Sequence, residues 1–240
     1  MASPGVRIEY QSDVLVMTLN NPATGNEITG AMFDAMSAVL AREALAPRAR
    51  VLHIRAEGDV FCRGRERAGR DEATVRAEVE RLIAFKRAVM ASPLISIAEV
   101  HGDAAGFGMG LAVVCDFTYV AATAILSFPE MRSGLPPAAI MAYLGDYALP
   151  KRIFPLLLLA PDFTASHAHD LGLVTHVVPR GSLRDEVQAV IRQILAVDGD
   201  AARQCKAYFR AASSSTLDDN FARASDLLTV RTLRLQSPRR

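Results

Sequence analysis

Three segments carry residue types that could do chemistry, and the first is the glycine-rich run 101–111. It follows an expected strand over 94–100 and leads into an apolar helix that ends near Cys115. A helix N-terminus offers unpaired backbone N–H groups and the positive end of the helix dipole, and small residues let a ligand approach that backbone closely. The run therefore predicts an anion or oxyanion site, with tight helix packing as the alternative. A dinucleotide fingerprint fits poorly, because Leu111 stands where its third glycine would be.

The second segment, 61–67, places a glycine among three arginines, Arg63, Arg65 and Arg67. Guanidinium groups bind phosphate and carboxylate oxygens in a bidentate manner. The composition is therefore typical of a turn that faces negative charge such as phosphate. A solvated surface loop is the competing interpretation, and the segment alone favours it.

The third segment, 127–137, contains Glu130 in an otherwise apolar loop. Burial raises the pKa of a carboxyl and suits it to act as a base. The alternative is a structural ion pair, for which Arg132 is the nearest candidate in the sequence. Taken alone, this segment favours the ion pair.

Other kinds of chemistry find no support in the sequence. The five histidines show no paired-ligand spacing, and no G-x-S-x-G motif is present. The three cysteines are widely spaced, so they form neither a metal pattern nor a disulfide framework. We therefore expect no metal ion and a reducing compartment.

Composition narrows the class of protein further. The 240 residues include 27 basic and 26 acidic side chains, a net charge of +1, which removes the electrostatic argument for a nucleic-acid partner. Segment 1–11 lacks the apolar stretch of a signal peptide, and the longest aliphatic run, 156–160, is far short of a membrane span. These features predict a soluble cytoplasmic protein without a membrane partner.

Hydrophobic periodicity predicts the elements that position these segments. A hairpin is expected over 7–20, with further strands at 51–54, 94–100, 117–121, 126–128 and 174–178. Helices are expected from a Thr29 cap to about Leu40, over 71–92, and after the turn 102–110 as far as about Cys115. Further helices are expected over 138–148, 151–160, 164–171, 182–197, 200–212 and 217–235. Strands alternating with helices indicate an α/β protein, and the helical tail indicates a packing or assembly region.

Taken together and in this order, the segments resemble the crotonase family, the enoyl-CoA hydratase/isomerase superfamily, over nearly the whole chain. F-C-R-G-R-E at 61–66 is similar to the family's F-C-A-G-A-D, and 102–116 is similar to G-x-A-x-G-G-G-x-E-L-A-x-x-C-D. Further matches lie at 21–28, 128–137 and 168–179. Each match alone is weak, but five in the same order and spacing are specific.

The resemblance implies a crotonase-like spiral of ββα units, with a core over 1–195 that holds the CoA and acyl site. It also implies a helical C-terminal trimerisation region over 196–240, and therefore self-association as a trimer or a dimer of trimers. The implied ligand is an acyl-CoA thioester, with coenzyme A as part of the substrate and no separate cofactor. Two backbone N–H donors that hold the thioester oxygen of an enolate match Arg65 and Phe107.

Typical hydratases of this family have catalytic glutamates at two positions. The second matches Glu130, whereas the first matches Gly110, which has no side chain. Hydration usually needs two groups, but moving a double bond from C3 to C2 needs one base that removes a proton at C2 and returns it at C4. The resemblance therefore favours an isomerase-like enzyme of fatty acid metabolism. An enoyl-CoA hydratase, which is a lyase, and a catalytically weak CoA-ester-binding protein remain alternatives.

The resemblance also places the nucleotide part of CoA near the loops 26–28 and 63–68. The arginines of the second loop suit its phosphates. A lysine on a C-terminal helix is expected to reach the CoA of a neighbouring subunit. The predicted CoA contacts are Glu27, Arg63, Glu66, Arg67, Ala68 and Lys206.

Overall fold

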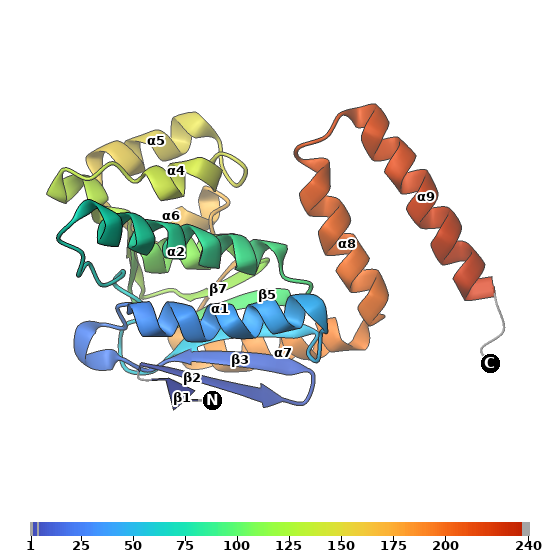
Figure 1. Cartoon of the computed structure of the whole chain (residues 1–240), viewed down its shortest axis with the longest axis horizontal. Helices are drawn as coiled ribbons and strands as arrows, with labels where there is room; N and C mark the ends of the chain where they lie inside the picture. The colour runs from blue at the N-terminus through green and yellow to red at the C-terminus, as the bar shows by residue number, and fades with distance from the viewer. Residues whose placement is uncertain (1, 4, 237–240) are drawn as a thin grey trace.

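The computed structural model describes residues 2–3 and 5–236, and these form two β-sheets surrounded by helices (Figure 1). The larger sheet has the strand order β1-β2-β3-β4-β5-β7-β10, and the smaller has the order β6-β8-β9. The strands are β1 (Ala2–Ser3), β2 (Val6–Gln11), β3 (Val14–Leu19), β4 (Val51–Ala56), β5 (Ile95–Val100), β6 (Ala104–Ala105), β7 (Phe117–Ala121), β8 (Ile125–Ser127), β9 (Asp162–Thr164) and β10 (His176–Val178). The helices are α1 (Gly30–Leu45), α2 (Glu72–Ala91), α3 (Phe107–Val114), α4 (Ala138–Leu144), α5 (Pro150–Leu159), α6 (Ala165–Asp170), α7 (Leu183–Ala196), α8 (Gly199–Ala212) and α9 (Leu217–Gln236).

The predicted N-terminal hairpin is confirmed, and it follows the edge strand β1 in the larger sheet. Strands β2 and β3 pair antiparallel from Val6–Leu19 to Gln11–Val14. From β3 onward the pairs β3–β4, β4–β5, β5–β7 and β7–β10 are parallel. All six residues of β3 are buried, as expected for a strand with covered faces in a parallel sheet.

Helices α1 and α2 begin at side-chain caps and pack together over the sheet. The Thr29 hydroxyl accepts a hydrogen bond from Met32 N at 3.3 Å, which confirms the predicted start of α1. Asp71 caps α2 in the same way, through Thr74 N at 2.9 Å. The predicted apolar face of α1 is buried, and α2 buries Leu82, Phe85, Lys86 and Val89. Lys86 is unusual among these residues, because a lysine side chain is rarely buried.

The smaller sheet contains two strands that the sequence pattern does not predict. Strands β6 and β9 are two and three residues long, too short to show a two-residue periodicity. Strand β6 pairs with β8, and the isolated bridge Cys62–Ala104 joins it to the arginine-rich loop. This sheet therefore brings the three candidate segments together.

The C-terminal helices α8 and α9 stand beside the main body as a separate pair (Figure 1). Helix α9 buries none of its side chains in this chain, and Phe221 and Leu228 on its predicted apolar side are 66% and 65% exposed. Phe209 on α8 is also largely exposed. This arrangement suits the expected assembly region, which stays a prediction. None of the described helices has the combined length and apolar character needed to cross a bilayer.

Candidate functional site

The arginine-rich loop and the glycine-rich turn are held in direct contact. Cys62 N donates to Asp103 O at 3.2 Å, and Ala105 N donates to Cys62 O at 2.9 Å. Gly108, in the first turn of α3, lies so close that a Cβ there would be 2.2 Å from Cys62 O. The predicted tight packing of the glycine run is therefore real, and it brings two loop backbones to one place.

Packing does not exclude the oxyanion interpretation, because two backbone amides remain available. Ile28 N donates to Gly64 O at 3.1 Å, and Glu66 N donates to Ile28 O at 3.0 Å. In such a parallel bridge the amide of the central residue, Arg65, points away from Ile28. Phe107 is the first residue of α3, so its N–H has no acceptor within the helix. Both predicted donors lie on segments that the Cys62 bonds hold together.

Glu130 lies against the glycine that precedes the Phe107 amide. It belongs to the short 3-10 helix η2 (Pro129–Ser133), and Gly106 N donates to Ser127 O at 3.0 Å just before that helix. Gly106 has a φ of +52°, which favours glycine, and a Cβ there would be 3.0 Å from Glu130 Oε1. The structure thus brings the third segment to the glycine-rich turn.

The Glu130 carboxyl is in an environment that suits a base. Its Oε2 atom is buried and has no hydrogen-bond partner in the described structure. Burial raises the pKa of Glu130, while a hydrogen bond from its own backbone and the charges of Lys86 and Arg67 oppose this without cancelling it. The competing ion pair with Arg132 is not formed, because that guanidinium binds Asp162 at 2.7 Å and Ala160 O.

The room next to Gly110 is occupied by two polar atoms from other helices. A Cβ at position 110 would be 2.4 Å from Lys86 Nζ and 2.6 Å from Tyr143 Oη. Lys86 Nζ donates to Tyr143 Oη at 2.8 Å, and Tyr143 Oη donates to Gly110 O at 3.1 Å. Lys86 also lies 5.1 Å from the ring centroid of Phe107. Lys86 is not among the residues predicted from the sequence, although its place between Leu82 and Val89 on an apolar helix face is a detectable signal.

The side chain of Phe107 packs into the core. It is 4% exposed, and its ring centroid lies 5.0 Å from that of Phe33 in an edge-to-face arrangement and 6.2 Å from that of Phe85. The ring therefore fills space between α1 and α2, and its backbone N–H stays at the start of α3.

The predicted CoA contacts in the arginine-rich loop are mostly accessible. Arg63, Glu66, Arg67 and Ala68 are exposed, and Glu27 is half-buried. The guanidinium of Arg65 is different, because it forms an ion pair with Glu78 at 3.3 Å. Glu78 also accepts hydrogen bonds from Ala68 N at 3.1 Å and Gly69 N at 2.7 Å, and so shapes this loop. The loop offers Arg63 and Arg67, rather than three free arginines, to a phosphate.

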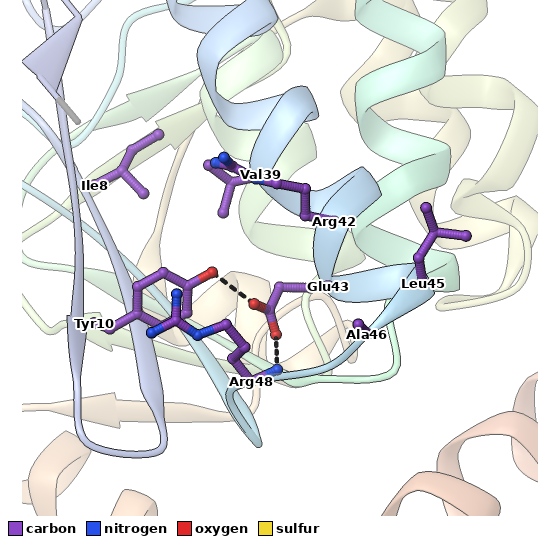
Figure 2. Close-up of a pocket in the computed structure, with 8 residues that line it drawn as sticks. All are labelled: Ile8, Tyr10, Val39, Arg42, Glu43, Leu45, Ala46 and Arg48. Atoms are coloured by element: carbon purple, nitrogen blue, oxygen red, sulfur yellow. Dashed lines mark hydrogen bonds between the residues drawn. The ribbon is translucent and has the colours of Figure 1, made fainter.

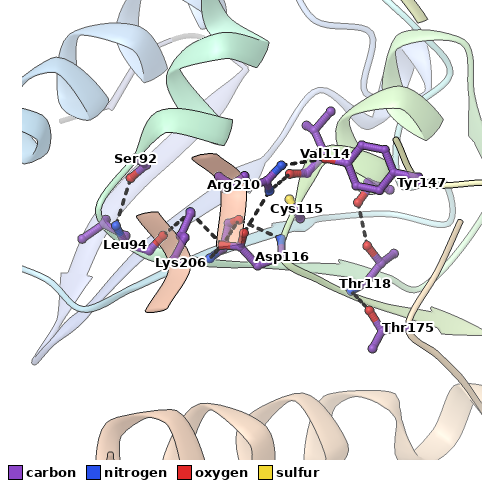
Figure 3. A network of polar contacts seen from close by, with 12 residues as sticks. Ser92, Leu94, Val114, Cys115, Asp116, Thr118, Tyr147, Thr175, Lys206 and Arg210 are labelled. Atoms are coloured by element: carbon purple, nitrogen blue, oxygen red, sulfur yellow. Dashed lines mark hydrogen bonds and ion pairs between the residues drawn. The ribbon is translucent and has the colours of Figure 1, made fainter. Parts of the chain in front are cut away.

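Lys206 lies apart from the other predicted contacts. It is 9% exposed, pairs with Asp116 Oδ2 at 2.7 Å and donates to Leu94 O at 2.6 Å (Figure 3). These bonds fix α8 to its own chain. The structure therefore argues against the predicted role of Lys206 at a neighbouring CoA and gives it a structural role.

A cavity of about 560 Å³ lies outside this site, between the hairpin and the end of α1 (Figure 2). Its one buried carboxylate, Glu43, accepts hydrogen bonds from Tyr10 Oη at 2.6 Å, Arg48 N at 2.8 Å and Ala49 N at 3.0 Å. Because these bonds satisfy both carboxylate oxygens, Glu43 joins α1 to the hairpin. Over residues 2–3 and 5–236 no group of three or more His, Cys, Asp or Glu side chains could hold a metal ion.

Replacement of Gly108 by alanine tests the close approach of the two loops. The new Cβ would meet Cys62 O at 2.2 Å, a backbone atom, so α3 and the arginine-rich loop must separate. We expect a lower urea midpoint, with a cost of about 1–3 kcal/mol from overpacking. The matched control is Gly145→Ala, where nothing lies within 4 Å of the added Cβ. An unchanged midpoint in Gly108→Ala would show that the contact is not needed.

Comparison with known proteins identifies the family. A family model described as enoyl-CoA hydratase/isomerase matches residues 9–234. The chain belongs to the enoyl-CoA hydratase/isomerase family. The predicted membership is confirmed, and it accounts for the order of the five motifs.

Solved structures of this family confirm the crotonase-like fold. The enoyl-CoA hydratase of Mycobacterium smegmatis superposes with a TM-score of 0.90 at 25% identity, covering 98% of this chain and 93% of that one. A putative enoyl-CoA hydratase of Thermobifida fusca, solved in complex with CoA, superposes with a TM-score of 0.85 at 27% identity, covering 96% and 94%. The alternation of strands and helices read from the sequence is therefore that of the family.

Curated relatives carry both activity names. The chain is 32% identical over 158 residues to the enoyl-CoA isomerase/hydratase fer4 of Mycosarcoma maydis, which is 62% of this chain and 56% of that protein. It is 30% identical over 190 residues to the human mitochondrial enoyl-CoA hydratase domain-containing protein 2, which is 74% of this chain and 64% of that protein. The chain thus spans less than two thirds of each of these two relatives.

Proposed function

We propose that the chain is an acyl-CoA-processing enzyme of the isomerase type, which moves the double bond of a 3-enoyl-CoA to C2. Glu130 is the base in this proposal. Its support is a carboxyl whose Oε2 is buried without a hydrogen bond and whose Oε1 lies against Gly106, next to the Phe107 amide, which has no acceptor within its helix. The fer4 relative, named an isomerase/hydratase, belongs to the same chemistry.

The proposed reaction uses one base and two amides. Glu130 takes a proton from C2, and the electrons of the C2–H bond form an enolate whose negative charge lies on the thioester oxygen. The N–H groups of Arg65 and Phe107 donate to that oxygen, and each donor of this kind contributes about 3–4 kcal/mol in the transition state. Glu130 then returns the proton to C4, which leaves the double bond between C2 and C3.

The preference for isomerisation over hydration depends on the surroundings of Gly110. Activating water requires a second acceptor, and position 110 has no side chain to supply it. The room is taken by Lys86 Nζ, which donates to Tyr143 Oη, and by Tyr143 Oη, which in turn donates to Gly110 O. Position 110 therefore supplies no second carboxylate, and proton transfer in this proposal depends on Glu130.

The CoA part of the substrate is assigned to the exposed face of the arginine-rich loop. Arg63 and Arg67 are exposed there, and the Thermobifida fusca relative was solved with CoA. Self-association as a trimer or a dimer of trimers through the apolar side of α8 and α9 is part of the same proposal. Sedimentation that shows only monomer would contradict the assembly.

Two substrates distinguish isomerase from hydratase. With a 3-enoyl-CoA we expect the absorbance of a conjugated 2-enoyl thioester to increase. With a 2-enoyl-CoA we expect no loss of that absorbance beyond the amount converted to the 3-isomer, as determined by chromatography. Formation of 3-hydroxyacyl-CoA would instead support the hydratase, which many relatives' names favour. Binding of both esters without turnover would support a CoA-ester-binding protein.

A further inference from the structure

Lys86 is a buried ammonium without a contacting carboxylate. It is 4% exposed and extends from the apolar face of α2. Its hydrogen-bond partner is the neutral hydroxyl of Tyr143, at 2.8 Å, and among the described residues no carboxylate forms an ion pair with Nζ. An uncompensated buried charge is costly, and such a lysine persists only where nearby groups offset that cost.

The neighbours of Lys86 provide that compensation without direct contact. Its Nζ lies 5.1 Å and 5.0 Å from the ring centroids of Phe107 and Tyr143, whose faces attract a cation. Glu130 Oε1 lies beside Gly106 and Lys86 Nζ lies beside Gly110, and a hydrogen bond of 2.9 Å from Gly110 N to Gly106 O joins these two glycines. The carboxylate therefore acts on the ammonium through the electric field. The same field acts in return on Glu130, whose Oε2 is buried without a hydrogen bond. Each of the two groups is therefore the main counter-charge available to the other.

The other titratable groups around Lys86 and Glu130 do not supply a competing negative charge near pH 7. Burial raises the pKa of the Cys62 thiol to about 12 and raises that of Tyr143 well above its ordinary value, so both stay neutral near pH 7. Tyr147 is a further neighbour that acts on Tyr143, and burial raises the pKa of Tyr147 as well. Arg67, on the exposed loop, adds a second positive field at Glu130.

We propose that Lys86, oriented by Tyr143 in the room left by Gly110, is a positioning residue that keeps Glu130 anionic and balances the negative charge of the reacting substrate. This inference rests on the proposed function of Glu130 as the base. When Glu130 takes a proton, the carboxylate becomes neutral and one negative charge appears on the enolate. The site therefore holds one negative charge throughout, and Lys86 offsets it on both sides of the step without changing its own protonation.

Gly110 makes room for the contact between Lys86 and Tyr143. Any side chain at position 110 would begin 2.4 Å from Nζ and 2.6 Å from Tyr143 Oη. The glycine is therefore what admits the Lys86–Tyr143 pair beside the start of α3.

The pH dependence of kcat/KM shows whether the positive charge of Lys86 favours the reaction. Burial lowers the pKa of Lys86 to about 8, and the negative charge of Glu130 opposes this shift. In the parent we therefore expect kcat/KM to rise as Glu130 ionises and to fall above about pH 8 as Lys86 loses its charge. Lys86→Met removes the fall, and it moves the acidic limb upward by about one pH unit because the favourable field is gone. Lys86→Arg, which stays charged, also removes the fall but leaves the acidic limb near its parent position.

The decisive measurement titrates Glu130 in the free protein by infrared spectroscopy. The carboxyl band is assigned as the difference between each protein and its Glu130→Gln form. We expect the midpoint in Lys86→Met to lie about one pH unit above the parent, and in Arg87→Met, an exposed neighbour on α2, to equal it. Tyr143→Phe keeps the cation and tests its orientation, with a smaller upward shift expected.

The outcomes separate this inference from the proposed function. If enoyl-CoA is not converted but the midpoint moves in Lys86→Met, the function of the site is wrong and the charge relation holds. If enoyl-CoA is converted and the midpoint does not move, Lys86 is a packing residue and the inference is overturned. A midpoint that moves equally in Arg87→Met would overturn it as well, because the effect would then be a general one.

Discussion

Glu130→Gln is expected to lower kcat for 3-enoyl-CoA isomerisation by roughly 10²–10⁴-fold, the contribution of a positioned base. Glutamine has the size of glutamate but cannot accept a proton at neutral pH. The Arg65 and Phe107 amides stay in place, so we expect a much smaller change in KM. Stopped-flow or steady-state absorbance at the conjugated thioester band measures both constants.

Stability separates a chemical role of Glu130 from a structural one. The parent protein holds a carboxyl whose Oε2 is buried and unbonded and whose pKa burial raises. A neutral amide is less costly to bury than a carboxylate, but the substitution also leaves the buried Lys86 without its counter-charge. Because these two effects oppose each other, we expect Glu130→Gln to melt close to the parent temperature.

A matched control for this substitution is Glu72→Gln. Glu72 lies at the exposed start of α2, in an i,i+4 pair with Arg76, and should change neither rate nor melting temperature appreciably. Full isomerase activity in Glu130→Gln would contradict the proposed base. A loss of activity that accompanies a fall in melting temperature would point to a structural role instead.

Local patterns predict the parts of this fold that depend on neighbouring residues. The hairpin follows from periodicity, and the Thr29 cap follows from a hydroxyl that lies close in sequence to the amide that donates to it. The order of the motifs also predicts that the three candidate segments belong to one site. The structure brings the segments together, and the close approach at Gly106 and Gly108 is possible because glycine has no side chain.

Contacts between distant elements explain what the sequence does not predict. Lys86 on α2 meets Tyr143 on α4, and the room that Gly110 leaves between them is visible only in three dimensions. Arg65 has the composition of a phosphate-binding residue, but Glu78 on α2 takes its guanidinium. Charge type alone does not tell which cations remain free.

Lys206, on the C-terminal helix α8, is another cation whose availability does not follow from its charge. A lysine on an amphipathic helix is usually exposed, whereas this one is buried against Asp116. Asp116 lies just after α3, far from α8 in sequence, and it appears in the family motif as the final residue. Its role as the anchor of α8 follows from the structure and gives the second large prediction.

Asp116→Asn is expected to destabilise the protein by about 3–5 kcal/mol, the cost of leaving buried cations without their carboxylate. Asp116 Oδ2 accepts from Ser96 N and Ser96 Oγ, both at 2.8 Å. It also pairs with Lys206 Nζ, while Oδ1 binds Arg210 at 2.9 Å (Figure 3). The network joins α8 to β5 and to the end of α3. We expect a lower urea midpoint with an unchanged slope. Asp59→Asn, from an exposed pair with Arg180, is the control and should leave the midpoint nearly unchanged.

The pH dependence of this difference identifies the Asp116 carboxylate as its source. Burial raises the pKa of Asp116, but Lys206 beside it and hydrogen bonds from Lys206 and Ser96 outweigh burial, and the net pKa lies below its ordinary value. A group with a lowered pKa stabilises the folded state fully above its unfolded value, about 3.9 for Asp, and this contribution disappears as the pH falls through the folded value. The stability gap between parent and Asp116→Asn should therefore be constant near neutral pH and narrow in acid, because protonated Asp116 resembles asparagine. A gap that stays constant down to the acid transition would mean that the lost stability comes from altered packing rather than from the ion pairs that hold α8.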